Sequence, residues 1–369
     1  MKILIVKTSS LGDLIHVFPV LSYLRQRFPE AQIDWVVERP FASLIEAHPY
    51  VNRVISIDTR VWKRALFSRR TWREIRDARR ELRTEEYDCV YDLQGNVKSG
   101  LVTFLARSAC KVGFGPASLP EWPNRFFTNH QYEISLGQNI REDYLSIVKQ
   151  HLSDKGEGGE KDVDEAVLLL RLSDDERRSI QPYLLDKAIL VCPGSAWRNK
   201  RMTEEALIAL LRGILKNAGG SGETHLLFAW GSDEERACVG RLHEEFLGEC
   251  ESTVMERLSL PALQHVMAHV ETVLAMDSLA LHLCGTTQTP SLSVFGPSAM
   301  NKYKPLGSEH RAYQGKCPYG QQFEKRCPIL RTCQTGACIR DLDVGEVLEC
   351  LGREGREGSE KCPKKDSSI

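Results

Sequence analysis

Short, continuous apolar runs recur along this chain, and each is followed by a polar turn and a segment with helical spacing. In the first unit, apolar residues 3–6 precede the polar residues 8–10, and apolar side chains then recur every three or four positions at Leu14, Val17, Leu21, Leu24 and Phe28. Continuous apolar runs are typical of strands that are covered on both faces, and the wider spacing is typical of one helix face. The pattern predicts a strand, a turn and a helix.

The same alternation predicts two successive halves. Further strands are expected at residues 32–38, 54–57, 87–94, 111–114, 188–192, 225–229, 272–276 and 290–295, with helices between them. Such alternation predicts an α/β fold of two Rossmann-like domains that face each other across a cleft. We expect an N-terminal domain at residues 1–172, a C-terminal domain at 173–350 and, from its Gly, Glu and Lys content, a disordered tail at 351–369.

Composition and charge narrow the class of protein. The 369 residues carry a net charge of −1, which argues against a general nucleic-acid binder. No apolar run approaches the roughly 18 residues that cross a bilayer, and the N-terminus lacks an apolar stretch long enough for secretion. We therefore expect a cytoplasmic protein without a transmembrane segment.

One basic segment stands out against this neutral background. Residues 60–83 hold ten basic and three acidic side chains. Residues 73–83 are interpreted as the charged outer face of a helix. Residues 60–67, where Arg60, Lys63 and Arg64 alternate with Trp62 and Phe67, are predicted to form a loop that suits an anionic, partly apolar partner at a membrane surface.

Other turns carry residues that suit a nucleoside diphosphate. In the second half, the turn after residues 188–192 offers Ser195 and Lys200 for phosphate, without the pattern of a Walker loop. Glu235 begins a helix where a carboxylate accepts from ribose hydroxyls, and Asp277 with Ser278 opens another helix that could receive a pyrophosphate. Each of these side chains, taken alone, is also explained as an ordinary helix cap.

Two positions in the first half add a carboxylate and a cation. Asp13 follows the first predicted strand and would sit at the sheet edge where α/β proteins bind ligands. Its alternative role is that of a helix N-cap. Lys98 lies in the first turn of the helix predicted at residues 97–107, where the backbone favours an anion.

Several motifs together resemble the family 9 glycosyltransferases. The opening Lys7-Thr-Ser-Ser-Leu-Gly-Asp13, with His16 and Pro19, is similar to the N-terminal signature of that family. Residues 34–38, 60–64, 92–99, 230–235, 277–283 and 294–297 also resemble it, and the likeness runs in the same order over residues 1–345. It implies a GT-B fold, an ADP-heptose donor, inversion at the anomeric carbon, no cofactor and no required metal.

The resemblance also implies roles for particular residues. Asp13 matches the proposed general base, and the donor positions are Ser195, Lys200, Glu235, Leu258, Asp277, Ser278, Leu279 and His282. The implied acceptor is the 3-deoxy-octulosonate of the lipopolysaccharide inner core on lipid A, at the inner membrane surface, where we expect the protein to associate peripherally. Its anionic groups fit Arg60, Lys63, Arg64, Gln94 and Lys98.

This chain departs from the family pattern in the donor segments. Leu279 stands where the family commonly has glycine, and a hydroxyl pair is reduced to Gly194-Ser195. A related transferase with another nucleotide sugar or acceptor is therefore an alternative. A catalytically silent paralogue that binds nucleotide is a second one, although such a protein would have no need of Asp13.

The cysteines fall into two groups. Cys89, Cys110, Cys192 and Cys284 lie in apolar or helical contexts and are predicted to be buried thiols. A late group comprises Cys317, Cys327, Cys333 and Cys338, whose spacings lack the Cys-x-x-Cys knuckle of zinc sites. A packing role is favoured for the late group over a metal site or a redox pair.

Overall fold

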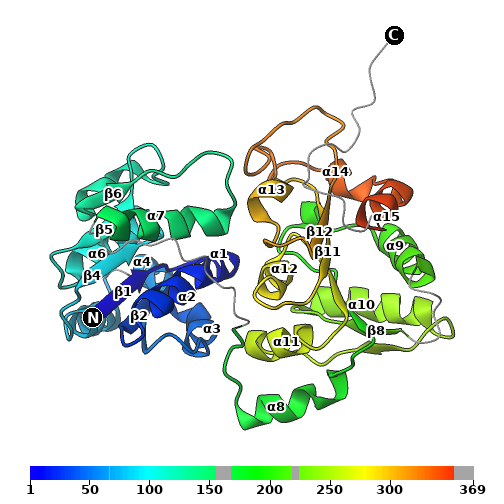
Figure 1. Ribbon diagram of the computed structural model, residues 1–369, viewed down its shortest axis with the longest axis horizontal. Helices are drawn as coiled ribbons and strands as arrows, with labels where there is room; N and C mark the ends of the chain where they lie inside the picture. The colour runs from blue at the N-terminus through cyan, green and yellow to red at the C-terminus, as the bar shows by residue number, and fades with distance from the viewer. Residues whose placement is uncertain (66, 155–167, 218–223, 353–369) are drawn as a thin grey trace.

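The computed structural model describes residues 1–65, 67–154, 168–217 and 224–352, and it contains two parallel six-stranded sheets side by side (Figure 1). The strand orders are β3-β2-β1-β4-β5-β6 and β12-β11-β10-β7-β8-β9, so both halves are doubly wound in the same way. This is the arrangement of a Rossmann-like unit, and it appears twice. The α/β fold predicted from the sequence is confirmed.

The N-terminal half alternates strands with helices throughout. Its strands are β1 (Lys2–Val6), β2 (Gln32–Glu38), β3 (Arg53–Ile57), β4 (Cys89–Asp92), β5 (Lys111–Phe114) and β6 (His130–Tyr132). Its helices are α1 (Leu11–Ile15), α2 (Phe18–Arg27), α3 (Ala42–Glu46), α4 (Thr59–Arg64), α5 (Arg69–Leu82), α6 (Val97–Leu105) and α7 (Ile140–Asp154), with 3-10 turns η1 (Arg39–Phe41) and η2 (Trp122–Phe127).

The C-terminal half repeats this alternation. Its strands are β7 (Ala188–Cys192), β8 (His225–Phe228), β9 (Ser252–Val254), β10 (Thr272–Met276), β11 (Ser291–Phe295) and β12 (His310–Gln314). Its helices are α8 (Asp174–Ile180), α9 (Glu204–Asn217), α10 (Asp233–Phe246), α11 (Leu260–Met267), α12 (Leu279–Cys284), α13 (Met300–Tyr303), α14 (Ala337–Arg340) and α15 (Val344–Gly352), with 3-10 turns η3 (Gln181–Tyr183) and η4 (Arg198–Lys200).

Strand register brings the polar turns of each sheet to one edge. In β1, Val6 pairs with Val36 of β2 and with Asp92 of β4, so β1 and β4 end together and β2 extends two residues further at the same edge of the sheet. Both faces of β1 are covered, and the side chains of residues 3–6 are fully buried. This double burial explains why the strand has a continuous apolar run rather than an alternating one.

Two predicted local structures are wrong. The single helix expected after residue 10 is divided into α1 and α2, because Pro19 stands in the first turn of α2 and cannot lie inside a continuous helix. The loop expected at residues 60–67 contains helix α4, whose first turn is capped by Asp58 accepting from the Val61 N–H at 3.2 Å. Phe67 lies beyond this helix, in a short connection to α5.

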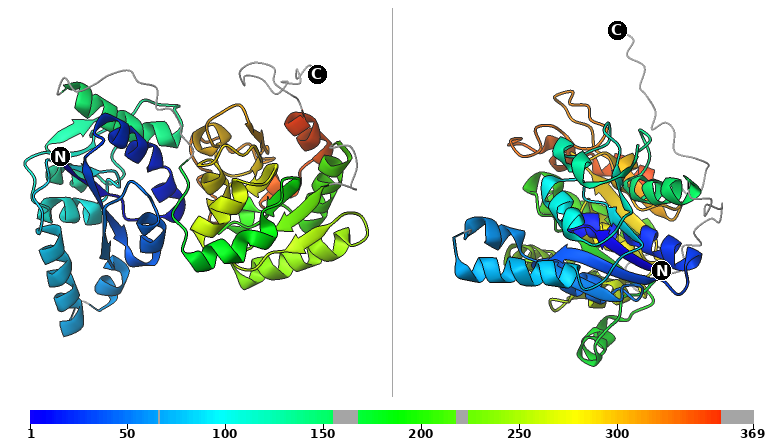
Figure 2. Two further views of the ribbon diagram at one scale, coloured as in Figure 1. Left: turned by 60° about the horizontal axis from the view of Figure 1, so that its bottom comes forward. Right: turned by 90° about the vertical axis from the view of Figure 1, so that its left-hand side faces the viewer.

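The two halves lie side by side in the left view of Figure 2 and are joined by side-chain contacts as well as by the chain. Lys302 of α13 forms a buried ion pair with Asp143 of α7, and Asn139 Nδ2 donates to the Lys304 carbonyl at 2.9 Å. The expected boundary at residues 172 and 173 stays a prediction. The predicted tail lies outside the described residues from residue 353, whereas residues 351–352 close α15 and are not disordered.

Candidate active site

A cavity of about 580 Å³ lies between the two halves, lined by α1 on one side and by the loops after β7, β8 and β10 on the other. Asp13 lines this cavity. So does every residue that the sequence assigned to the donor: Ser195, Lys200, Glu235, Leu258, Asp277, Ser278, Leu279 and His282. The structure thus brings together residues from both halves of the chain, as the convergence of strand ends predicts.

Asp13 is the third residue of α1 and not its N-cap. The N-cap is Ser10, and Asp13 Oδ2 accepts from the Ser10 N–H at 3.1 Å and from its Oγ at 2.8 Å. Burial raises the pKa of the Asp13 carboxyl, but the charge of Lys7 and the bonds from Ser10 outweigh it, so the pKa lies below its usual value. Asp13 is therefore an ionised carboxylate at neutral pH.

Lys7 is a buried cation that sequence reasoning did not assign to the site, although it opens the first motif. Its Nζ donates to the Leu93 carbonyl at 2.9 Å and to the Tyr144 hydroxyl at 2.8 Å. Burial lowers the pKa of Lys7 to about 8, against the opposite influence of Asp13 and Asp92. The positive charge of Lys7 therefore stabilises the ionised Asp13 carboxylate from within the protein core.

Across the cavity, Lys200 and Asp277 form a buried ion pair. His282 Nε2 lies 3.7 Å from Asp277 Oδ1, and burial lowers the pKa of His282 to about 4 in spite of this carboxylate. His282 is thus neutral near pH 7. The Lys200 ammonium has three N–H donors, so its bond to Asp277 leaves donors for another anion.

The hydroxyl groups in the cavity differ in their partners. Ser195 Oγ donates to the Asp277 carbonyl at 3.3 Å, which joins the loops after β7 and β10. Ser278 is the N-cap residue of α12, yet its buried Oγ makes no hydrogen bond within the described part of the chain. Because buried polar atoms are usually paired, this hydroxyl is a position where a ligand oxygen would satisfy it.

Glu235 links two of the loops. Its Oε2 accepts from the Gly231 N–H at 2.7 Å. A Cβ atom at Gly194 would come within 2.3 Å of Glu235 Oε1, so any side chain there would displace this carboxylate from its present position. Glu235 is thereby fixed at the edge of the cavity.

The two halves touch directly beside Asp13. The rings of His16 and His282 lie edge to face with their centroids 4.3 Å apart. A Cβ at Gly12 would lie 3.0 Å from His282 Cδ2, which is a tight approach. Helix α1 therefore packs against α12 with little space between them.

Arg326 is a second cation that sequence reasoning missed. It lines the cavity, its charge acts on Asp13, and its guanidinium carbon lies 5.1 Å from the centre of the Tyr303 ring. Arg326 precedes Cys327 in the sequence, but it lies in an irregular segment with no strand or helix pattern. Nothing in the local sequence therefore predicted that this segment lines the cavity.

The five residues assigned to the acceptor do not line this cavity. Arg60, Lys63 and Arg64 lie on α4, where the spacing of three and four residues places them on one helix face. Lys98 Nζ donates to Thr59 Oγ1 at 3.4 Å, which links α6 to the start of α4. Gln94 Oε1 accepts from the Thr8 and Ser9 N–H groups at 3.1 Å each, so it holds the loop before α1.

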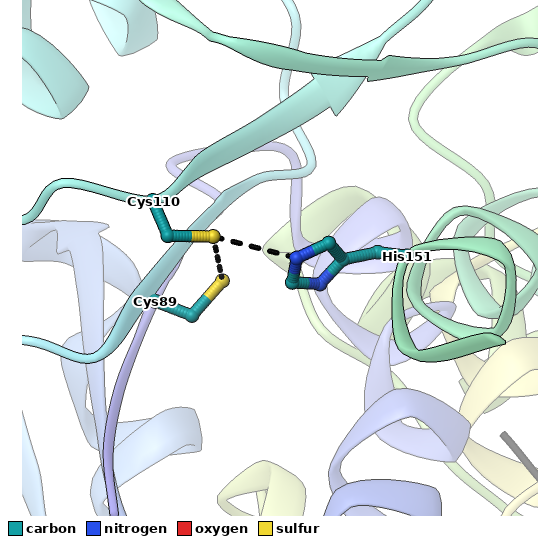
Figure 3. Close-up of side chains that lie close together, drawn as sticks. All are labelled: Cys89, Cys110 and His151. Atoms are coloured by element: carbon teal, nitrogen blue, oxygen red, sulfur yellow. Dashed lines mark hydrogen bonds between the residues drawn. The ribbon is translucent and has the colours of Figure 1, made fainter. Parts of the chain in front are cut away.

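The predicted buried thiols of the first half are confirmed. Cys89 Sγ lies 3.4 Å from Cys110 Sγ, and Cys110 Sγ lies 3.3 Å from His151 Nε2 (Figure 3). His151 Nδ1 in turn lies 2.9 Å from the Tyr91 hydroxyl. The two sulfur atoms and a His151 ring nitrogen all lie within 4.8 Å of one another, which is close enough for them to share a metal ion. All three side chains are buried in the core between β4 and α7.

The late cysteines also come together, although less closely. Cys317, Cys327, Cys333 and Cys338 line one small cavity together with Asn199. Asn199 Nδ2 donates to the Cys333 carbonyl at 2.6 Å and to the Leu330 carbonyl at 2.9 Å. Because Asn199 precedes Lys200, the cysteine segment supports the loop that carries this lysine.

Comparison with known proteins agrees with this geometry. Residues 75–332 match the model of glycosyltransferase family 9 (heptosyltransferase). Lipopolysaccharide heptosyltransferase 1 of Pseudomonas aeruginosa is 32% identical over 81% of this chain and 79% of its own, and that of Escherichia coli is 30% identical over 81% and 88%. The solved structure of E. coli heptosyltransferase WaaC with ADP-2-deoxy-2-fluoro heptose has a TM-score of 0.70 and 27% identity, covering 86% of this chain and 94% of that one.

Two doubly wound halves around a shared cleft, together with these matches, define a glycosyltransferase of the GT-B type. The chain belongs to glycosyltransferase family 9.

Proposed function

We propose that this enzyme transfers heptose from ADP-heptose to the 3-deoxy-octulosonate of the lipopolysaccharide inner core, on a lipid A precursor. The observation that carries the proposal is one cavity in which Asp13 of the first half faces the loop residues of the second. The names of the relatives support heptose transfer in lipopolysaccharide synthesis, and the solved structure with a fluorinated ADP-heptose supports the donor.

In this proposal the donor binds to the C-terminal half. Lys200 offers the diphosphate its free N–H donors, Ser278 offers its buried hydroxyl, and Arg326 adds a second positive charge. Glu235 accepts from the ribose hydroxyls, and Leu258 supplies an apolar contact. Asp277 acts through Lys200, whose ammonium it holds in place.

The chemical step is a single displacement. The oxygen of an acceptor hydroxyl forms a bond to the anomeric carbon while the bond from that carbon to the phosphate oxygen breaks. Asp13 takes the hydroxyl proton, and the bonding electrons leave with ADP. The depressed pKa of Asp13 keeps it ready to accept this proton at neutral pH. Because attack and departure occur on opposite faces of the carbon, the configuration is inverted.

Positive charge for the leaving diphosphate comes from Lys200 and Arg326 in this scheme, so the proposal requires no metal. Turnover should then continue in the presence of a chelator. Loss of turnover that added Mg²⁺ restores would contradict this part of the proposal.

The acceptor is expected on the side of the N-terminal half. The basic face of α4 and Lys98 of α6 present cations to an anionic sugar acid and to the phosphates of lipid A. No helix in the described part of the chain is both long and apolar enough to span a bilayer. We propose peripheral association with the cytoplasmic face of the inner membrane.

One observation favours an alternative substrate. Leu279 brings a side chain to the edge of the cavity where the family commonly has glycine, which narrows the room beside the diphosphate. A related family 9 transferase with another nucleotide sugar or acceptor is therefore the second candidate, and a nucleotide-binding protein without turnover is the third.

Calorimetry against ADP, UDP and GDP tests the donor nucleotide, and a turnover assay with ADP-heptose distinguishes an active enzyme from a protein that only binds nucleotide. We expect ADP to bind most tightly, and we expect turnover with ADP-heptose to give a product of inverted configuration by NMR. Preference for UDP or GDP would overturn the donor assignment. ADP binding without turnover on any inner-core acceptor would favour the silent protein.

A further inference from the structure

Four large apolar side chains are exposed together on the outer side of the N-terminal half. Leu101 and Phe104 of α6 are 50% and 63% exposed, and Trp122 and Phe126 of η2 are 56% and 69% exposed. We call the surface of these four residues the α6–η2 face. Helix α6 lies at the left of Figure 1, on the side turned away from the C-terminal half.

The two elements of this face are packed tightly against each other. A Cβ at Gly100 would come within 2.3 Å of Phe127 Cδ2, so α6 and η2 approach as closely as glycine permits. The Phe104 and Phe127 rings lie edge to face at 6.3 Å, and those of Trp122 and Phe126 at 5.2 Å. The exposed rings are thus held on a rigid surface and not on a loose loop.

Two cations lie beside the exposed rings of this face. The Arg125 guanidinium carbon lies 5.3 Å from the Trp122 ring centre and 5.8 Å from that of Phe126, and Lys111 Nζ lies 5.6 Å from the Phe104 ring centre. In the described part of the chain no ion pair joins Arg125 or Lys111 to a carboxylate, and Lys111 Nζ donates to the Phe104 carbonyl at 3.0 Å. Glu121 is the acidic neighbour, and it accepts from the Val97 N–H at 2.9 Å.

This combination fits a lipid surface better than a second protein. Tryptophan and phenylalanine rings insert at the level of the lipid headgroups, and Lys and Arg side chains without carboxylate partners attract anionic headgroups. Four large apolar side chains exposed on two elements that pack together also need an explanation in a folded enzyme. We infer that the α6–η2 face docks this enzyme on the surface of an anionic membrane.

The position of α6 connects this face to the acceptor side of the cleft. The helix begins near Lys98, which contacts the start of α4, and its outer face continues through Leu101 to Phe104 at intervals of three residues. A lipid-anchored acceptor that leaves the membrane beside Phe104 would meet the cations of α4 and Lys98. This link rests on the proposed function, whereas the docking itself does not.

The test uses flotation of the full chain with vesicles of phosphatidylethanolamine and phosphatidylglycerol, and with phosphatidylcholine vesicles for comparison. A Phe104→Ser, Phe126→Ser double variant should lower partitioning onto the anionic vesicles by about tenfold or more. The matched control is Leu247→Ser, because Leu247 is 64% exposed on the C-terminal half and should leave partitioning unchanged. Wild-type protein should bind the phosphatidylcholine vesicles more weakly.

Melting temperature and ADP affinity should be the same in both variants and the wild type, which excludes misfolding as the cause. Equal partitioning of the double variant and the wild type would overturn the inference. A wild-type dimer in sedimentation velocity that the double variant abolishes would also overturn it, since the face would then belong to a second copy. Intact vesicle binding without heptose transfer would defeat the proposed function and leave the docking in place.

Discussion

Asp13 has a structural partner in Ser10 besides its proposed role as a base, and one substitution separates the two roles. The amide of an Asp13→Asn variant keeps an oxygen that accepts from the Ser10 N–H, so the melting temperature should stay nearly unchanged. An amide cannot take the acceptor proton, and kcat should fall by about 10²–10⁴-fold. Steady-state kinetics with unchanged ADP affinity would support the base, and near-normal kcat would exclude it.

Lys200 and Asp277 must be tested as a pair, because each compensates the charge of the other in a buried place. Lys200→Ala should weaken ADP binding by roughly 1.5–3 kcal/mol and should also lower the melting temperature, since it leaves a carboxylate without its cation. A Lys200→Ala, Asp277→Asn double variant should recover much of the lost stability but not the ADP affinity. Calorimetry that finds wild-type ADP affinity in either variant would remove Lys200 from the donor site.

Among the elements, α4 is the one whose correction sharpens a functional expectation. As a helix it presents Arg60, Lys63 and Arg64 on one face, whereas a loop would have dispersed them. Replacing all three by Ala should raise the acceptor KM and reduce its dependence on salt, with ADP affinity kept. Loss of ADP binding with unchanged acceptor kinetics would show that donor and acceptor sides are reversed.

The strands that could be predicted most directly from the sequence are those with a continuous apolar run. Strands β7 and β10 have the predicted bounds, because both of their faces are covered and almost every side chain is apolar. Strands β2 and β5 also have the predicted bounds, although a polar residue or a glycine interrupts the apolar run of each. Strands β6, β9 and β12 were not predicted. Each lies at the edge of a sheet and keeps side chains that are only partly buried, so no uninterrupted apolar run marks it in the sequence.

The same contrast holds for the cavity. Apart from Leu258, the residues assigned to the donor follow predicted strands, and their convergence needs only the rule that parallel strands end at a common edge. Arg326 and the pairing of Lys200 with Asp277 depend on long-range packing of irregular segments. No local periodicity records such packing.

At the scale of the whole molecule, buried neutral histidines should make the folded protein less stable in acid. Burial lowers the pKa of His48 to about 3 and those of His282 and His310 to about 4. An unfolded chain binds these protons near pH 6.5, so the folded state binds fewer protons between about pH 6.5 and 4 and loses stability as the pH falls through that range.

The expected loss is on the order of 1.4 kcal/mol per histidine for each pH unit in that range. Urea unfolding at several pH values measures it. The slope of the unfolding free energy against pH reports how many more protons the unfolded chain binds, and His48→Gln should lower that number by about one. The His48 ring packs against Phe18 and Tyr50, so this substitution should leave the residues of the cleft unchanged. A free energy of unfolding that is flat from neutral pH to about pH 4.5 would contradict these depressed pKa values.

The close approach of Gly12 to His282 leaves little room between the two halves beside Asp13. In the proposed mechanism the base and the donor lie on opposite halves, so bond formation depends on how closely the halves approach, and a Cβ at Gly12 would lie only 3.0 Å from His282 Cδ2. A methyl group there would push the His282 ring and α12 away from α1 by a few tenths of an ångström. Gly12→Ala should leave ADP affinity unchanged but lower kcat, which calorimetry and steady-state kinetics measure separately. Alanine at this position would therefore separate the ability to bind from the ability to react.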